Sequence, residues 1–120
     1  MKVENIMQHL IGKKYKEVIE ALSFEQDDGD CCGWASVDVI DAVKDLQNCE
    51  KAKLVNVVKI DYSDDDYEGD RVVANFVFDL GKEKGLILGY ELNAGSGSGW
   101  NYGAWCHLKY GDELVAYASW

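Results

Sequence analysis

Apolar and polar residues alternate most regularly in the second half of the chain. From residue 71 to residue 80, apolar side chains occupy every second position, and the positions between them are mixed. A period of two is typical of a β-strand that buries one face. The apolar face consists of Val72, Ala74, Phe76, Phe78 and Leu80. This pattern predicts a strand over 71–80.

The same pattern continues toward the C-terminus. Residues 86–92 are the next expected strand, and residues 81–85 are the expected hairpin turn before it. Its apolar face consists of Leu86, Leu88, Tyr90 and Leu92. Two further expected strands, 104–110 and 114–120, are separated by a turn at Gly111 and Asp112. Four consecutive strands joined by turns predict an antiparallel meander.

Residues with high β-propensity also mark two segments in the first half of the chain. Residues 53–62 are rich in Val and Ile and predict a strand. Residues 34–40 predict a shorter strand that follows the turn-forming residues 27–33. Asp41 is then placed to cap a short helix over 42–47.

The N-terminal apolar residues recur at intervals of three and four. This spacing predicts a short helix over 2–11 that ends at Gly12. The apolar residues of 13–25 fit either a helix or an irregular strand, and the residues alone leave both structures open.

Length and composition bound the fold. The chain has 120 residues, of which 48% are hydrophobic and 28% charged, which is enough apolar surface for one core and too little for two. We therefore expect a single domain over 1–120. Together with the expected elements, this predicts an α+β fold, an antiparallel β-sheet meander with one or two short helices packed on one face.

Negative charge dominates the chain and gathers in two clusters. The formal net charge is -10. One cluster consists of Glu25, Asp27, Asp28 and Asp30, and the other of Asp61, Asp64, Asp65, Asp66, Glu68 and Asp70. This charge disfavours direct binding to nucleic acid and favours a basic protein surface, which the second cluster is expected to contact. The alternative is that both clusters are solvated loops that serve solubility.

A segment rich in glycine, serine and aromatic residues spans 93–105. It is followed by a strand in which alternation places Trp105, His107 and Lys109 on the outer face. An indole, an imidazole and an ammonium group beside glycine amides could hold an anionic or aromatic ligand. The candidate ligand-binding residues are Asn93, Ser96, Ser98, Trp100, Asn101, Tyr102, Trp105, His107 and Lys109. The alternative is an ordinary exposed sheet face beside a loop that needs glycine to turn.

No motif in the chain predicts catalysis, a metal site or a cofactor. Cys31 and Cys32 are adjacent, Cys49 and Cys106 are isolated, and the acidic segment departs from the EF-hand pattern. Alternation places Cys106 and His107 on opposite faces of a strand. We expect buried cysteines that act as small hydrophobic residues, while a vicinal or redox role for the adjacent pair stays open. With no apolar run long enough for a signal peptide or a membrane span, we expect a cytoplasmic protein.

Three segments resemble a family of small phage and bacterial proteins that is catalogued as a domain of unknown function. They are the early LIGK segment at residues 10–13, the DGDCC segment at 28–32, and the Asn/Gly/aromatic loop at 93–103. The resemblance covers roughly residues 10–110. It implies a phage or prophage origin and a compact α+β fold, and it favours a strand over 14–20. It implies no activity.

The function expected from these observations is non-enzymatic. The leading hypothesis is a phage accessory protein in the host cytoplasm that inhibits a host protein, such as a defence or nucleic-acid-binding factor, by binding its basic surface. The alternative is a small-molecule sponge that sequesters a nucleotide-like signal at the Gly-rich aromatic loop. Homo-oligomers are compatible with both hypotheses.

Overall fold

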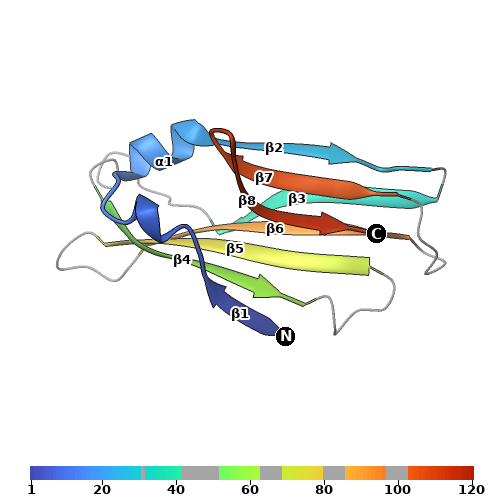
Figure 1. Ribbon diagram of the computed structural model, residues 1–120, viewed down its shortest axis with the longest axis horizontal. Helices are drawn as coiled ribbons and strands as arrows, with labels where there is room; N and C mark the ends of the chain where they lie inside the picture. The colour runs from blue at the N-terminus through green and yellow to red at the C-terminus, as the bar shows by residue number, and fades with distance from the viewer. Residues whose placement is uncertain (31, 42–51, 63–68, 80–85, 97–102) are drawn as a thin grey trace.

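Two antiparallel β-sheets face each other in a computed structural model that describes residues 1–30, 32–41, 52–62, 69–79, 86–96 and 103–120. The larger sheet has five strands in the order β1 (Lys2–Asn5), β4 (Lys53–Asp61), β5 (Gly69–Asp79), β6 (Leu86–Ser96), β3 (Gly33–Asp41). The smaller sheet has three strands in the order β2 (Leu22–Asp27), β7 (Trp105–Tyr110), β8 (Glu113–Ser119). In the described residues, the only α-helix is α1 (Tyr15–Ala21), and η1 (Gln8–Leu10) is a single 3-10 turn (Figure 1).

The fold is therefore mostly β rather than clearly α+β. The prediction of antiparallel strands is confirmed, but the prediction that the four strands from residue 71 to residue 120 form one meander is wrong. β5 pairs with β6 in the large sheet, whereas β7 pairs with β8 in the small sheet. The prediction that helices cover the sheet is wrong, because the three-stranded sheet covers it instead (Figure 1). The reason is that β7 and β8 also have an apolar face, which must be buried against another layer.

The core lies between the two sheets and confirms the predicted alternation. Phe76 and Phe78 of β5 are fully buried, and so are Leu92 of β6 and Leu108 of β7. The ring of Phe78 meets the edge of Tyr15 from α1, with the ring centroids 5.1 Å apart. Burying each of these large side chains contributes roughly 1.5–3 kcal/mol to folding.

The prediction of a helix over 2–11 is wrong. Residues 2–5 form β1, which pairs with β4, and residues 6–15 continue along the same edge of β4. The Ile6 amide donates to the Val57 carbonyl at 2.9 Å, and the Gly12 amide donates to the Leu54 carbonyl at 2.8 Å. Helical spacing of the apolar residues is overridden because this edge of β4 offers hydrogen-bonding groups that a local helix would leave unused.

The strand favoured over 14–20 is also wrong. This segment forms α1, which buries Tyr15 and Val18, and the chain changes to β2 only at Leu22. The predicted strands at 34–40, 53–62, 104–110 and 114–120 are confirmed within one or two residues at each end. The helix expected at 42–47 and the turn expected at 81–85 lie outside the described residues. None of the described helices is long and apolar enough to cross a membrane.

Candidate binding face on the small sheet

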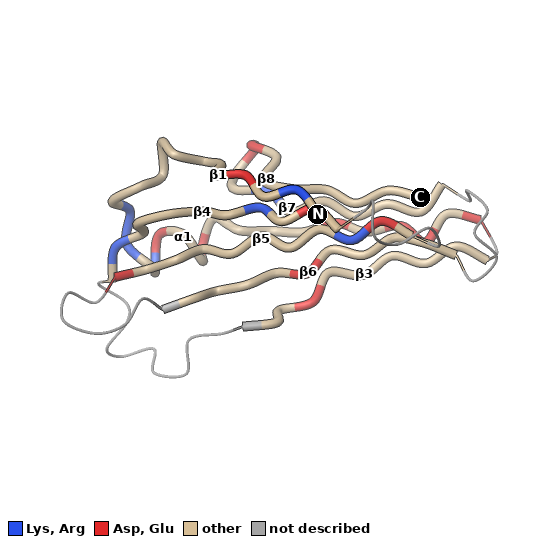
Figure 2. Tube along the Cα trace, turned by 90° about the horizontal axis from the view of Figure 1, so that it is seen from below, with Lys and Arg blue, Asp and Glu red and all other residues tan. Residues whose placement is uncertain are grey.

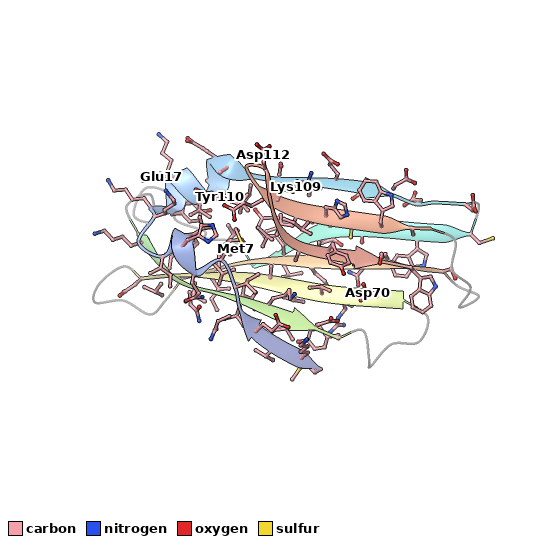
Figure 3. The ribbon with its side chains drawn as sticks, viewed as in Figure 1. Met7, Glu17, Asp70, Lys109, Tyr110 and Asp112 are labelled. Atoms are coloured by element: carbon pink, nitrogen blue, oxygen red, sulfur yellow. The ribbon has the colours of Figure 1, made fainter. Side chains whose placement is uncertain are left out.

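The outer face of β7 presents the side chains that alternation assigns to it. Cys106 and Leu108 are buried against the large sheet, while Trp105, His107 and Lys109 lie on the opposite side and are partly exposed. Figure 3 labels Lys109 on this strand. The predicted division of β7 into two faces is confirmed.

Three rings form a continuous surface on this outer face. The centroids of the Trp105 indole and the His107 imidazole are 4.7 Å apart, with 37° between the ring planes. The Tyr117 ring meets the edge of His107 with a centroid distance of 6.4 Å and an angle of 87°. We call Trp105, His107 and Tyr117 the outer aromatic row. Tyr117 is 53% exposed, and its place opposite His107 comes from the pairing of β7 with β8.

Two carboxylates lie next to the outer aromatic row on the other side of β7. Glu25 of β2 is directly opposite His107, and Asp27 is directly opposite Trp105. Both carboxylates are exposed, and one oxygen of Asp27 accepts the Gly29 amide at 2.7 Å. Residues directly opposite on neighbouring strands share a face, so the rings and the carboxylates form one surface. The sequence pattern does not place Glu25, Asp27 or Tyr117 on this surface, because only strand pairing brings them to it.

Acidic and basic residues are distributed unevenly over the rest of the molecule. Lys13, Lys14, Lys16 and Lys53 lie at the end beside α1, and the other described Lys and Arg residues are spread over β1, β4, β5 and β7 (Figure 2). The described parts of β3 and β6 carry only Asp and Glu among their charged residues. The small sheet has one described cation on its outer face, Lys109, which lies opposite Ser23. Glu25, opposite His107, is therefore one pair away from that cation, and Asp27, opposite Trp105, is two pairs away.

The expected acidic surface is described only in part. Asp64, Asp65, Asp66 and Glu68 lie outside the described residues. Asp61 ends β4, and Asp70 of β5 accepts the Ser119 amide of β8 at 3.0 Å. Burial raises the pKa of Asp70, the hydrogen bond from Ser119 opposes that shift, and the charge of Asp61 adds to it. Asp70 thus links the two sheets, and a partner-binding role for the cluster stays a prediction.

The candidate ligand-binding residues do not converge on one face. Asn93 lies on the outer face of the five-stranded sheet, where its amide donates to Glu91 at 3.2 Å, and Ser96 is 1% exposed. Trp105, His107 and Lys109 lie on the opposite side of the molecule. Ser98, Trp100, Asn101 and Tyr102 are outside the described residues. Asn93 and Ser96 are separated from Trp105, His107 and Lys109 because β6 and β7 belong to different sheets, and a ligand-binding role for these residues stays a prediction.

Comparisons with protein-family models, with curated proteins and with solved structures find no match to this chain. The resemblance to a phage and bacterial family therefore stays a prediction. The geometry of the described residues carries the argument about function.

The cysteines divide into a buried and an exposed class. Cys106 is fully buried, and its thiol donates to the Ser36 and Asn93 carbonyls at 3.5 Å. This burial confirms the expectation that Cys106 packs as a small hydrophobic residue, and it raises the pKa of the thiol. Cys32 is exposed, so the expectation of burial is wrong there; it lies in the turn-rich connection between β2 and β3. Cys31 and Cys49 are outside the described residues.

Metal ligands do not cluster in the described part of the chain. No group of three His, Cys, Asp or Glu side chains comes together there as a metal site requires. His9 Nε2 and Glu113 Oε1 lie 2.9 Å apart, and both side chains are 55% exposed. This contact ties η1 to the start of β8.

Proposed function

We propose that the protein is a non-enzymatic binding protein that holds a basic segment of another protein on the outer face of the three-stranded sheet. One observation carries the proposal: stacked Trp105 and His107 rings lie directly opposite the exposed carboxylates of Asp27 and Glu25. Arg and Lys side chains are attracted to the face of an indole ring and form charge-assisted hydrogen bonds with carboxylates.

The charges on this face orient the partner. Lys109 repels cations from its end of β7, so the partner's basic side chains bind nearest Trp105 and Asp27, with Glu25 between them and Lys109. An exposed cation–π contact contributes about 0.5–1 kcal/mol, so several such contacts are needed for useful affinity. The net charge of -10 speeds the encounter with a basic partner and makes binding sensitive to salt. Covering a basic surface would inhibit a host defence or nucleic-acid-binding protein, the role expected from the sequence.

A nona-arginine peptide tests this proposal as a minimal basic partner. Titration calorimetry should detect binding that weakens strongly between about 0.05 and 0.3 M salt. Trp105→Ala and Glu25→Gln should each lower the affinity about 3- to 10-fold, which corresponds to about 0.7–1.4 kcal/mol.

Matched controls lie elsewhere on the surface. Trp34 is 43% exposed on the outer face of the five-stranded sheet, and Glu20 is exposed on α1. Trp34→Ala and Glu20→Gln should leave the affinity within about twofold of the unmodified protein. The proposal is wrong if the control variants lower the affinity as much as Trp105→Ala and Glu25→Gln do.

The stacked Trp105 and His107 rings beside Lys109 favour a second candidate function, the binding of an anionic aromatic ligand such as a nucleotide. A nucleotide panel in a thermal-shift assay tests it, because a ligand at about 100 times its dissociation constant adds about 2.7 kcal/mol of stability. Lys109→Ala separates the two candidates by sign. The substitution should weaken nucleotide binding and strengthen nona-arginine binding.

A further inference from the structure

Two side chains that face the space between the sheets are nevertheless more than half exposed. Phe24 of β2 is directly opposite Leu108, and Val39 of β3 is directly opposite Tyr90. Leu108 and Tyr90 are buried, at 0% and 7% exposure, whereas Phe24 and Val39 are 52% and 55% exposed. Because residues directly opposite one another share a face, Phe24 and Val39 belong to the inner faces of the two sheets. The described residues therefore leave the apolar interior uncovered at this side of the sandwich.

This open side is where two edge strands meet. β2 ends the order of the small sheet, and β3 ends the order of the large sheet. The chain passes from β2 to β3 through residues 28–32, so both edges lie on the same side of the molecule (Figure 1). An edge strand presents backbone groups that can pair with another strand.

The backbone of β3 offers donors along this edge. The Ala35 amide donates to Asp28 Oδ1 at 2.9 Å, so it points away from β6. Amide direction alternates along an antiparallel strand, so the amides of Val37 and Val39 point the same way. Outside the strand ladders, no backbone carbonyl among the described residues accepts a hydrogen bond from either amide. The residues whose side chains face the interior are thus the residues whose backbone groups face outward along the edge.

The charges along this edge specify the occupant. Natural edge strands are commonly protected by Lys or Pro, and β3 contains neither. Its exposed Asp38 lies on the outer face of the large sheet, directly opposite Glu91 of β6, whereas Glu25 and Asp27 of β2 lie on the outer face of the small sheet. A second copy of this chain would bring like charges together at Asp38, with a net charge of -10 on each copy. A segment with Lys or Arg at these positions is complementary instead.

We propose that β3 accepts an extended segment of a basic protein as an added strand. Apolar side chains at alternate positions of the segment cover Val39 and Phe24, and Lys or Arg side chains between them lie on the outer face of the large sheet, where they face Asp38. Backbone hydrogen bonds to Val37 and Val39 supply affinity, as in other cases of strand addition. The inference rests on the proposed function for the basic character of the partner, and it adds a separate contact and a mode of binding.

A synthetic peptide of alternating Lys and Val tests the added strand, and a peptide of the same composition with all Lys before all Val is its control. Val39→Pro removes the outward amide without removing a hydrogen bond to β6, which a strand tolerates at its edge. Val39→Thr keeps the amide and the shape of the side chain. Calorimetry should show a loss of at least tenfold for Val39→Pro and of about two- to threefold for Val39→Thr, relative to the unmodified protein.

Hydrogen exchange provides the direct readout. The alternating peptide should slow exchange of the Val37 and Val39 amides, and the control peptide should leave it unchanged. The added strand is refuted if Val39→Pro binds the alternating peptide as well as Val39→Thr does, or if exchange at these amides does not slow. Dimers in sedimentation experiments that Val39→Pro abolishes would also refute it, because a second copy would then be the occupant.

The proposed function is tested separately by Trp105→Ala with the nona-arginine peptide. If Trp105→Ala loses nona-arginine binding while Val39→Pro still binds the alternating peptide normally, the proposed binding face stands and the added strand is rejected. Unchanged nona-arginine binding in Trp105→Ala, with peptide binding lost in Val39→Pro, would reject the binding face and retain the edge.

Discussion

Asp70 offers a test of how one carboxylate joins the two sheets. Its Oδ2 accepts the Ser119 amide at 3.0 Å, at the edge of the small sheet. Burial raises the pKa of Asp70 above its ordinary value of 3.8, the Ser119 amide opposes this shift, and the negative charge of Asp61 increases it. The native protein therefore disfavours the ionised form of Asp70 relative to the unfolded chain.

The sign of the pH dependence follows from the direction of this shift. Because the folded pKa of Asp70 is raised, its contribution to stability is complete below about pH 3.8 and is lost as the pH rises through the folded pKa. Asp70→Asn keeps an oxygen that accepts from Ser119 but cannot ionise. We therefore compare the free energy of unfolding of Asp70→Asn with that of the unmodified protein. The difference, variant minus unmodified protein, should increase as the pH rises from about 3.8 through the folded pKa of Asp70 and should then become constant.

The size of the hydrogen-bond contribution comes from a second variant. Asp70→Ala removes the acceptor, and a protein hydrogen bond contributes about 0.5–1.5 kcal/mol. Ser119 is exposed, so water replaces part of the lost contact, and we expect the lower half of that range at every pH. With a urea dependence of about 1–3 kcal/mol per M, the midpoint of Asp70→Ala should lie a few tenths of a M below that of Asp70→Asn.

Urea unfolding from about pH 3 to pH 8 measures both effects. Asp112→Asn is the control, because Asp112 is exposed in the turn between β7 and β8 (Figure 3). The reasoning is refuted if the difference between Asp70→Asn and the unmodified protein does not change with pH, or if Asp112→Asn shows the same change.

Three further predictions concern the core. Phe76→Ala should lower the free energy of unfolding by about 3–5 kcal/mol, whereas Phe24→Ala, at a site 52% exposed, should cost less than about 1 kcal/mol in chemical denaturation. Gly69→Ala should lower the Tm more than Gly89→Ala. At Gly69 the new Cβ would lie 2.7 Å from the backbone oxygen of Ala94, whereas at Gly89 it would lie 2.8 Å from the side-chain oxygen of Asn75, which can move. Cys106 should react with a disulfide reagent only when the protein unfolds, because burial raises the pKa of its thiol and excludes the reagent. Its reaction should therefore appear as a slow phase in the labelling time course, and that phase should be absent from Cys106→Ala.

The N-terminal segments show where local patterns fail. Apolar spacing at 2–11 is helical, yet the chain pairs with the edge of β4, which lies more than forty residues away along the sequence. Residues 14–20, for which the resemblance favours a strand, form a helix because Tyr15 and Val18 then reach the end of the core. Both outcomes depend on a distant partner that a short window of sequence does not contain.

The alternation of residues in β5, β6 and β7 was enough to identify strands and to say which side chains share a face. Trp105, His107 and Lys109 could be placed together for that reason, because the period of two is a local property of the extended backbone. The division into two sheets, and the arrival of Glu25 and Tyr117 beside His107, were decided only by strand pairing. Strand pairing joins residues far apart in the chain, so it depends on which apolar faces find one another in the folded protein.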